Sequence, residues 1–98
     1  MSKEVSYKNY DRFIQLGIVI GTLRKIRGMS QEQLAAEANI SRSFLGVIEA
    51  PNTAHCFSLE VFFDIADALD ISPTELLEAS LFPDKLPGKN KSKDNEKT

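Results

Sequence analysis

The side chains best suited to chemistry lie between Ser30 and Glu49, in the stretch SQEQLAAEANISRSFLGVIE. This stretch predicts two short helices joined by a tight turn, with Ser30 and Ser41 as the residues that begin them. A serine hydroxyl at such a position accepts a hydrogen bond from an unpaired amide of the first turn. The side-chain pattern of the second helix suits a DNA groove, so the stretch predicts sequence-specific DNA binding.

Other chemistry finds little support in the chain. A single cysteine excludes an internal disulfide, and Cys56 has no second cysteine and no histidine at zinc-ligand spacing. His55 adjoins Cys56 in a loop, which favours an ordinary loop histidine beside a half-buried thiol over a metal site. One histidine, one cysteine and no glycine-rich phosphate loop leave no catalytic constellation. We expect no enzyme activity, no metal and no cofactor.

Repeated capping signals predict the elements that position this stretch. Four serines follow an apolar residue and precede another by four positions, a pattern that begins helices: Ser30, Ser41, Ser58 and Ser72. Gln33 and Glu75 complete capping boxes with the first and last of them. Gly28, Asn39 and Pro51 mark helix ends. We expect an all-α, compact five-helix domain with helices at residues 10–27, 31–38, 42–49, 59–69 and 73–82.

Helical spacing of apolar residues predicts the core. We expect a buried stripe on the first helix, made by Phe13, Leu16, Ile20, Leu23 and Ile26. Further core residues are expected on the other helices: Leu34, Ala35, Ala38, Leu45, Ile48, Phe62, Ile65, Ala66, Leu69, Leu76 and Leu77.

The chain divides into an arm, a domain and a tail. Residues 1–9 are expected to form a flexible arm, residues 10–83 the DNA-binding domain, and residues 84–98 a disordered lysine-rich tail, because the tail is almost free of apolar side chains. The amino terminus does not resemble a signal peptide, and no apolar run is long enough to span a bilayer. We expect a soluble, cytoplasmic protein.

Charge is distributed unevenly along the chain. The net charge is −2, but residues 1–30 carry +4, residues 31–84 carry −9 and residues 85–98 carry +3. Because basic side chains supply most non-specific DNA affinity, the acidic middle predicts weak binding by a monomer. We expect a basic side facing DNA, formed by Arg24, Lys25, Arg27 and Arg42.

The block LRKIRGMSQEQLAAEANISRSFLGVIE, followed by SLEVFFDIADALDISPTELL, resembles the Cro and phage-repressor class of helix-turn-helix proteins, also called the Xre family. Several features coincide in order: the arginine of the first helix, the Ser-Gln start of the second, the Ile-Ser start of the third, its Ile-Glu end and the motif ALxxSPxELL. The resemblance implies five helices, with the third in the major groove and two subunits on two half-sites.

The same resemblance implies roles for single residues. Gln31 matches a residue that bonds a backbone phosphate, and Ser41, Arg42, Ser43, Phe44 and Val47 match the DNA-facing part of the recognition helix. Arg42 is suited to a bidentate contact with guanine, and Val47 to a thymine methyl group. For Phe44, packing on the DNA backbone and partial burial over the turn remain equally open. Arg24 and Glu49 match a structural ion pair between the first and third helices.

Three positions depart from the family pattern. Gly46 replaces a residue that is often serine, the loop APNTAHCF lacks basic residues that many members direct at phosphate, and Asp70 replaces a frequent glycine. These departures and the acidic middle leave a second hypothesis open: a protein-interaction module, or an antitoxin or controller component with weak DNA binding, on the same scaffold.

Surplus apolar residues predict a homodimer. Leu81 and Phe82 lie at the end of the fifth helix, and Tyr10, Ile14 and Ile18 lie on the first helix outside its buried stripe. A two-fold pairing through the last helix, with a contribution from the start of the first, would bury them and present two recognition helices to double-stranded DNA.

Overall fold

The computed structural model describes residues 5–81. This part of the chain contains five α-helices joined by turns and loops. They are α1 (Tyr10–Ile26), α2 (Gln31–Glu37), α3 (Arg42–Glu49), α4 (Leu59–Ala68) and α5 (Pro73–Leu81), and a 3₁₀ turn, η1 (Tyr7–Asn9), precedes them. No strand occurs within these residues. The all-α prediction is confirmed. Each helix begins where it was expected and ends there or one residue earlier.

Serine caps explain the sharp helix starts. The hydroxyls of Ser30, Ser41, Ser58 and Ser72 each accept a hydrogen bond from the amide three residues later, at 2.9 to 3.1 Å. The side chain of Gln33 returns the bond to the Ser30 amide at 2.8 Å, which completes a capping box. These local bonds satisfy helix amides that would otherwise be unpaired, so the starts depend little on distant contacts.

Three helices end in the left-handed conformation. Gly28 has φ +74°, Asn39 has φ +61° and Asp70 has φ +59°. Asn and Asp tolerate this region better than most residues, whereas glycine pays no steric cost there. The end of α4 receives further support from the guanidinium of Arg27, which donates to the carbonyl oxygens of Leu69 at 2.7 Å and Asp70 at 3.4 Å.

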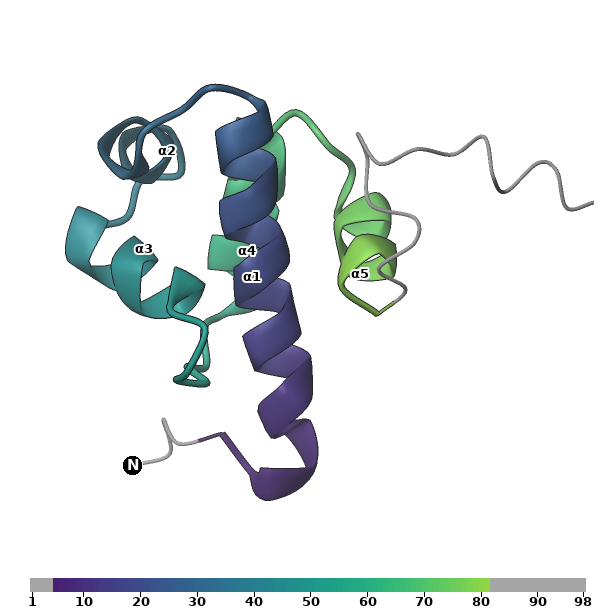
Figure 1. The fold of residues 1–98 in the computed structure, drawn as a ribbon. Helices are drawn as coiled ribbons and strands as arrows, with labels where there is room; N and C mark the ends of the chain where they lie inside the picture. Colours follow the sequence, from purple (N-terminus) through teal and green to yellow (C-terminus); the bar gives the residue numbers. More distant parts are fainter. Residues whose placement is uncertain (1–4, 82–98) are drawn as a thin grey trace, which may run out of the picture.

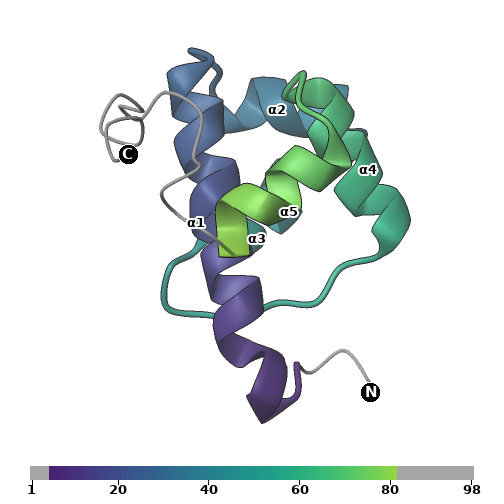
Figure 2. The ribbon, with the colours of Figure 1, turned by 90° about the vertical axis from the view of Figure 1, so that its right-hand side faces the viewer.

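Helix α1 runs through the centre of the domain. In Figure 1, α2 and α3 lie on one side of it and α5 on the other, and Figure 2 shows α5 crossing in front of α1. The core fills the space between them with apolar side chains from all five helices, and seven large ones are almost fully enclosed: Ile20, Leu23, Leu34, Leu45, Ile65, Leu69 and Leu76. Helices α3 and α5 therefore occupy opposite flanks of α1.

The buried core differs from the expected one at several positions. Ile26 is 49% exposed, Leu77 is 44% exposed and Phe13 is only partly buried, whereas Val19, Ile71 and Ala79, which were not among the expected core residues, are buried. Ile26 and Val19 point in similar directions from α1, but α5 crosses nearer the middle of the helix and leaves the last turn uncovered (Figure 2). Helix α5 buries one face, through Leu76, Ala79 and Ser80, and Leu77 lies about 100° away from Leu76.

The structure describes only part of the expected arm and none of the expected tail. Residues 7–9 of the arm form η1, which leads directly into α1. Phe82 and the expected tail, residues 84–98, lie outside the described residues. None of the helices described here has the length and apolar character needed to cross a membrane.

Candidate nucleic-acid interface

Helix α3 presents an exposed face to solvent. Leu45 and Ile48 are buried against the core, whereas Arg42, Ser43 and Val47 are exposed and Ser41 is exposed at the cap. Ser43 and Val47 project from the side of α3 opposite the buried pair, and Arg42, at the first helical position, lies about 60° around the helix from Leu45. An exposed guanidinium, a hydroxyl and an isopropyl group on one short helix provide the donors and the apolar surface that base edges require.

Phe44 occupies the flank of α3 rather than its exposed face. It is partly buried and packs against the hydrophobic core. Its ring also meets the imidazole of His55, from the loop between α3 and α4, edge to face with ring centres 5.6 Å apart and planes at 77°. Phe44 thus joins the loop to the recognition helix.

Arg24 and Glu49 form a bidentate ion pair between α1 and α3. The Nε and Nη2 atoms of Arg24 donate to the two carboxylate oxygens of Glu49 at 2.8 and 3.0 Å, with the two side chains only 11% and 8% exposed. The Nη1 atom of Arg24 donates to the carbonyl oxygen of Met29 at 2.8 Å. Two charged groups satisfied in this way connect α1, the turn before α2 and the end of α3.

Gln31 joins the same network. Its side-chain nitrogen donates to Oε1 of Glu49 at 3.0 Å, and its side chain is partly buried at the start of α2. A primary amide has two hydrogens on its nitrogen, so one bond to Glu49 leaves the second for another acceptor. Sequence spacing did not indicate this bond because 18 residues separate the two side chains.

Two of the four cations expected around the DNA side have partners within the domain. Arg24 is buried in its ion pair, and Arg27 donates to carbonyl groups at the end of α4. Lys25, Arg27 and Arg42 are exposed. That these cations lie around the side that faces DNA stays a prediction.

Acidic side chains are sparse in the sequence of α3 and of the loop that follows it. Between residues 38 and 59 the only acid is Glu49, which is paired with Arg24. The other acids of residues 31–81 belong to α2, α4, α5 and the turn after α4: Glu32, Glu37, Glu60, Asp64, Asp67, Asp70, Glu75 and Glu78. Residues 38–59 thus form a long stretch of this acidic region that itself contributes no unpaired carboxylate, which favours the approach of a polyanion to α3.

Comparison with known proteins supports this geometry. The family model described as helix-turn-helix matches residues 20–76. The restriction-modification controller protein C.AhdI from Aeromonas hydrophila is 36% identical, over 65% of this chain and 94% of its own, with a TM-score of 0.60. Wild-type C.Esp1396I, another restriction-modification controller protein, is 23% identical over 81% of this chain and 99% of its own, with a TM-score of 0.63. This second likeness shows the fold alone. A comparison with curated proteins gave no match.

Proposed function

The chain belongs to the helix-turn-helix family of Cro and phage-repressor type, and from this premise we propose that it binds a palindromic operator as a homodimer, with α3 of each subunit in the major groove. It is a sequence-specific DNA-binding transcriptional regulator. The likeness to C.AhdI favours a restriction-modification controller among the regulators of this class. As a regulator it has to reach DNA, which favours the cytoplasm, and its role is binding rather than catalysis.

One observation carries the proposal. Helix α3 and the loop after it lie in residues 38–59, where the only acid is the paired Glu49, whereas the rest of residues 31–81 is rich in acids. DNA carries a dense row of phosphates on both sides of the groove, so a reading helix needs neighbours that do not repel them. The acids of α4 and α5 would then face away from the duplex.

We assign base reading to the exposed face of α3. Arg42 is the donor for guanine O6 and N7, Ser43 bonds a base edge or a phosphate, and Val47 contacts a thymine methyl group. Ser41 caps the helix through its oxygen and keeps its hydroxyl hydrogen for a phosphate. Phe44 supports the flank of the helix rather than touching a base.

Gln31 is assigned to a backbone phosphate. Glu49 accepts one amide hydrogen of Gln31, and the second hydrogen is the donor for phosphate. The Arg24–Glu49 pair then has an architectural role, because it holds both α3 and the side chain of Gln31 in place.

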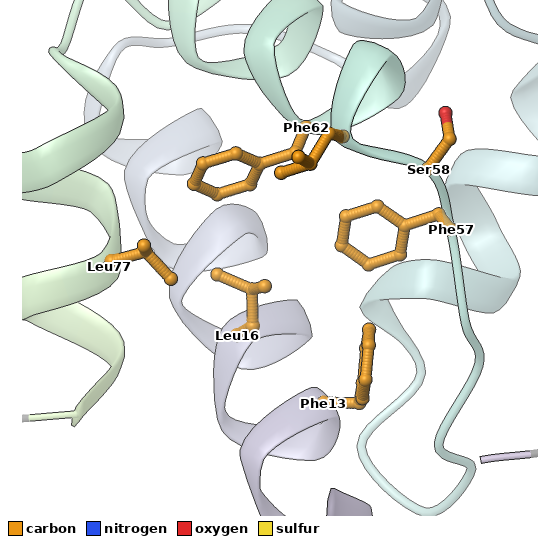
Figure 3. A pocket seen from close by; sticks show the side chains of 7 residues that line it. Phe13, Leu16, Phe57, Ser58, Phe62 and Leu77 are labelled. Carbon is orange, nitrogen blue, oxygen red and sulfur yellow. The ribbon is translucent and has the colours of Figure 1, made fainter.

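An apolar surface between α1, the start of α4 and α5 is assigned to the second subunit. Phe13, Leu16, Phe57, Phe62 and Leu77 surround a groove of about 320 Å³ (Figure 3). A second groove, of about 360 Å³, shares Phe13, Leu16 and Leu77 with the first and extends to Leu81.

Both protruding and recessed apolar groups occur on this surface. Leu59 is 68% exposed and Leu81 is 52% exposed, beside the grooves that could receive such side chains from another copy. A two-fold interface needs such self-complementarity, since the same patch meets itself. Tyr10, Ile14 and Ile18 point at least about 120° away from Leu16 around α1, so they do not belong to this surface. Pairing through α5 leaves α3 open on the other flank of α1 (Figure 1).

A second candidate is a protein-interaction module on the same scaffold. The acidic side chains of α4 and α5 favour it, since Glu60, Asp67, Asp70, Glu75 and Glu78 are all exposed. They suit a basic protein partner, and such a partner would bind without requiring DNA.

Selection from a random duplex library tests the proposed function. We expect the full chain to enrich sequences with two-fold symmetry and half-site centres about one helical turn apart, with affinity that falls as salt rises. Recovery of duplexes without any shared sequence would contradict sequence-specific reading and favour the second candidate.

A further inference from the structure

We propose that His55 is a further DNA-contacting residue: in its charged form its imidazole binds a backbone phosphate beside the groove that α3 enters. This inference rests on the proposed function and adds to it a contact that strengthens as pH falls. The proposed partner is the phosphodiester group of duplex DNA.

The first support is the shortage of cations around α3. Arg24 and Arg27 donate to groups inside the domain, and residues 31–81 contain no lysine and only one arginine, Arg42. His55 is the only other side chain in that range that can become cationic. A charge on His55 thus adds to a small number of cations, among them the exposed Lys25 and Arg42.

The second support is the position of the imidazole against the recognition helix. Its edge-to-face contact with Phe44 fixes the loop next to the flank of α3 that also carries Val47. The ring is partly exposed, and within the described residues its nitrogen atoms have no hydrogen-bond partner. It therefore keeps its donors for a ligand while its ring is held in place.

The third support is the electrostatic setting of the loop. Residues 50–59 carry no ionisable side chain other than those of His55 and Cys56. On α3, Glu49 is the only acid and is paired with Arg24, so the helix presents no unpaired carboxylate to the imidazole. The other charged residue of α3, Arg42, is exposed. The loop packs on α1 through the edge contact of Phe57 with Phe13 and leads into α4. The charged side chains of these flanking segments are Lys8, Asp11 and Arg12, before and at the start of α1, and Glu60 on α4.

A phosphate contact by imidazolium predicts a specific pattern of affinities. A phosphate attracts imidazolium and not neutral imidazole, so wild-type affinity for duplex DNA should rise as pH falls from about 8 to about 6. The salt dependence should steepen by about one unit per subunit over the same change.

Two substitutions test the charge itself. His55→Gln keeps a polar group without the charge, and we expect it to lose most of the gain on acidification. His55→Lys carries the charge throughout, and we expect it to bind about threefold or more tightly than wild type at about pH 8, with little further gain on acidification. Thr74→Lys is the matched control, because it adds the same charge at an exposed position on α5, away from α3.

The measurement is equilibrium binding of the full chain to the duplex recovered by selection and to a shuffled duplex of equal length, at both pH values and several salt concentrations. Thermal midpoints confirm that each variant is folded. An equal gain on acidification in wild type and His55→Gln would overturn the inference, as would equal tightening by His55→Lys and Thr74→Lys. Wild type that binds neither duplex at either pH would instead overturn the proposed function on which the inference depends.

Discussion

The backbone of Gly17 lies directly against the carbonyl group of Ile48, so that a methyl group added at Gly17 would overlap the carbonyl oxygen. One turn later, a methyl group at Gly21 would lie 3.2 Å from the carboxylate of Glu49. Because Gly17 and Gly21 have no side chains, α1 can approach the last turn of α3 closely at these two positions. The distance and angle of the recognition helix depend on this contact.

Gly17→Ala is expected to lower the free energy of unfolding by about 2 to 3 kcal/mol, because backbone atoms cannot move aside as a side chain can. Gly46→Ala is the matched control in the middle of α3, where an added methyl group meets nothing within 4 Å. It should raise stability by up to about 1 kcal/mol through the helix propensity of alanine. Thermal and urea unfolding measure both. A Gly17→Ala variant as stable as wild type would contradict the close approach.

Glu49→Ala is expected to destabilise the domain by about 3 kcal/mol or more, because the buried guanidinium of Arg24 loses both of its carboxylate bonds. Glu60→Ala, at an exposed position in the first turn of α4, is the control and should change stability by less than about 1 kcal/mol. Unfolding curves measure this difference. Unchanged stability with abolished DNA binding would show instead that Glu49 acts at the DNA.

Arg42→Ala is expected to weaken specific binding by about 1 to 3 kcal/mol and to relax the preference at one base pair in each half-site. Lys8→Ala removes an exposed lysine from η1 and is the control for loss of charge alone. The comparison uses matched and mismatched duplexes. An equal loss on every sequence would reduce the role of Arg42 to a phosphate contact.

Leu77→Glu combined with Leu81→Glu is expected to convert a dimer into a monomer with unchanged helical content, since both side chains border the apolar grooves and neither belongs to the core. Ile26→Glu removes an equally exposed apolar group from the end of α1 and should leave the dimer intact. Light scattering at micromolar concentration distinguishes the states. Wild type that stays monomeric both free and on DNA would refute the homodimer.

Local signals in the sequence predicted the helices well. The serine caps and the left-handed residues act within one turn of the chain, so Ser30, Ser58 and Asn39 could be interpreted without knowing what lies beside them. The ends of buried stripes were harder. Whether Ile26 or Leu77 is covered depends on where a neighbouring helix crosses, and that is a property of the assembled domain.

The partners of polar side chains were predictable only where a motif links them. The family resemblance indicated the pairing of Arg24 with Glu49, which the structure contains. It carried no information about Arg27 bonding the end of α4, 42 residues away, or about His55 resting on Phe44. Such contacts arise from the three-dimensional path of the loops, and sequence periodicity records nothing of that path.

Packing of α5 on α1 has a consequence for how the protein is made. The two helices stand near opposite ends of residues 5–81, yet α5 covers one flank of α1. Contacts between residues so distant in sequence form late, after the intervening chain has been drawn together. During translation, Leu16 on α1, which borders the same grooves as Leu77, therefore stays incompletely enclosed until residues 73–81 have left the ribosome. A nascent chain interrupted before that point exposes apolar surface that chaperones and proteases recognise, so incomplete copies are open to removal before they can compete for DNA.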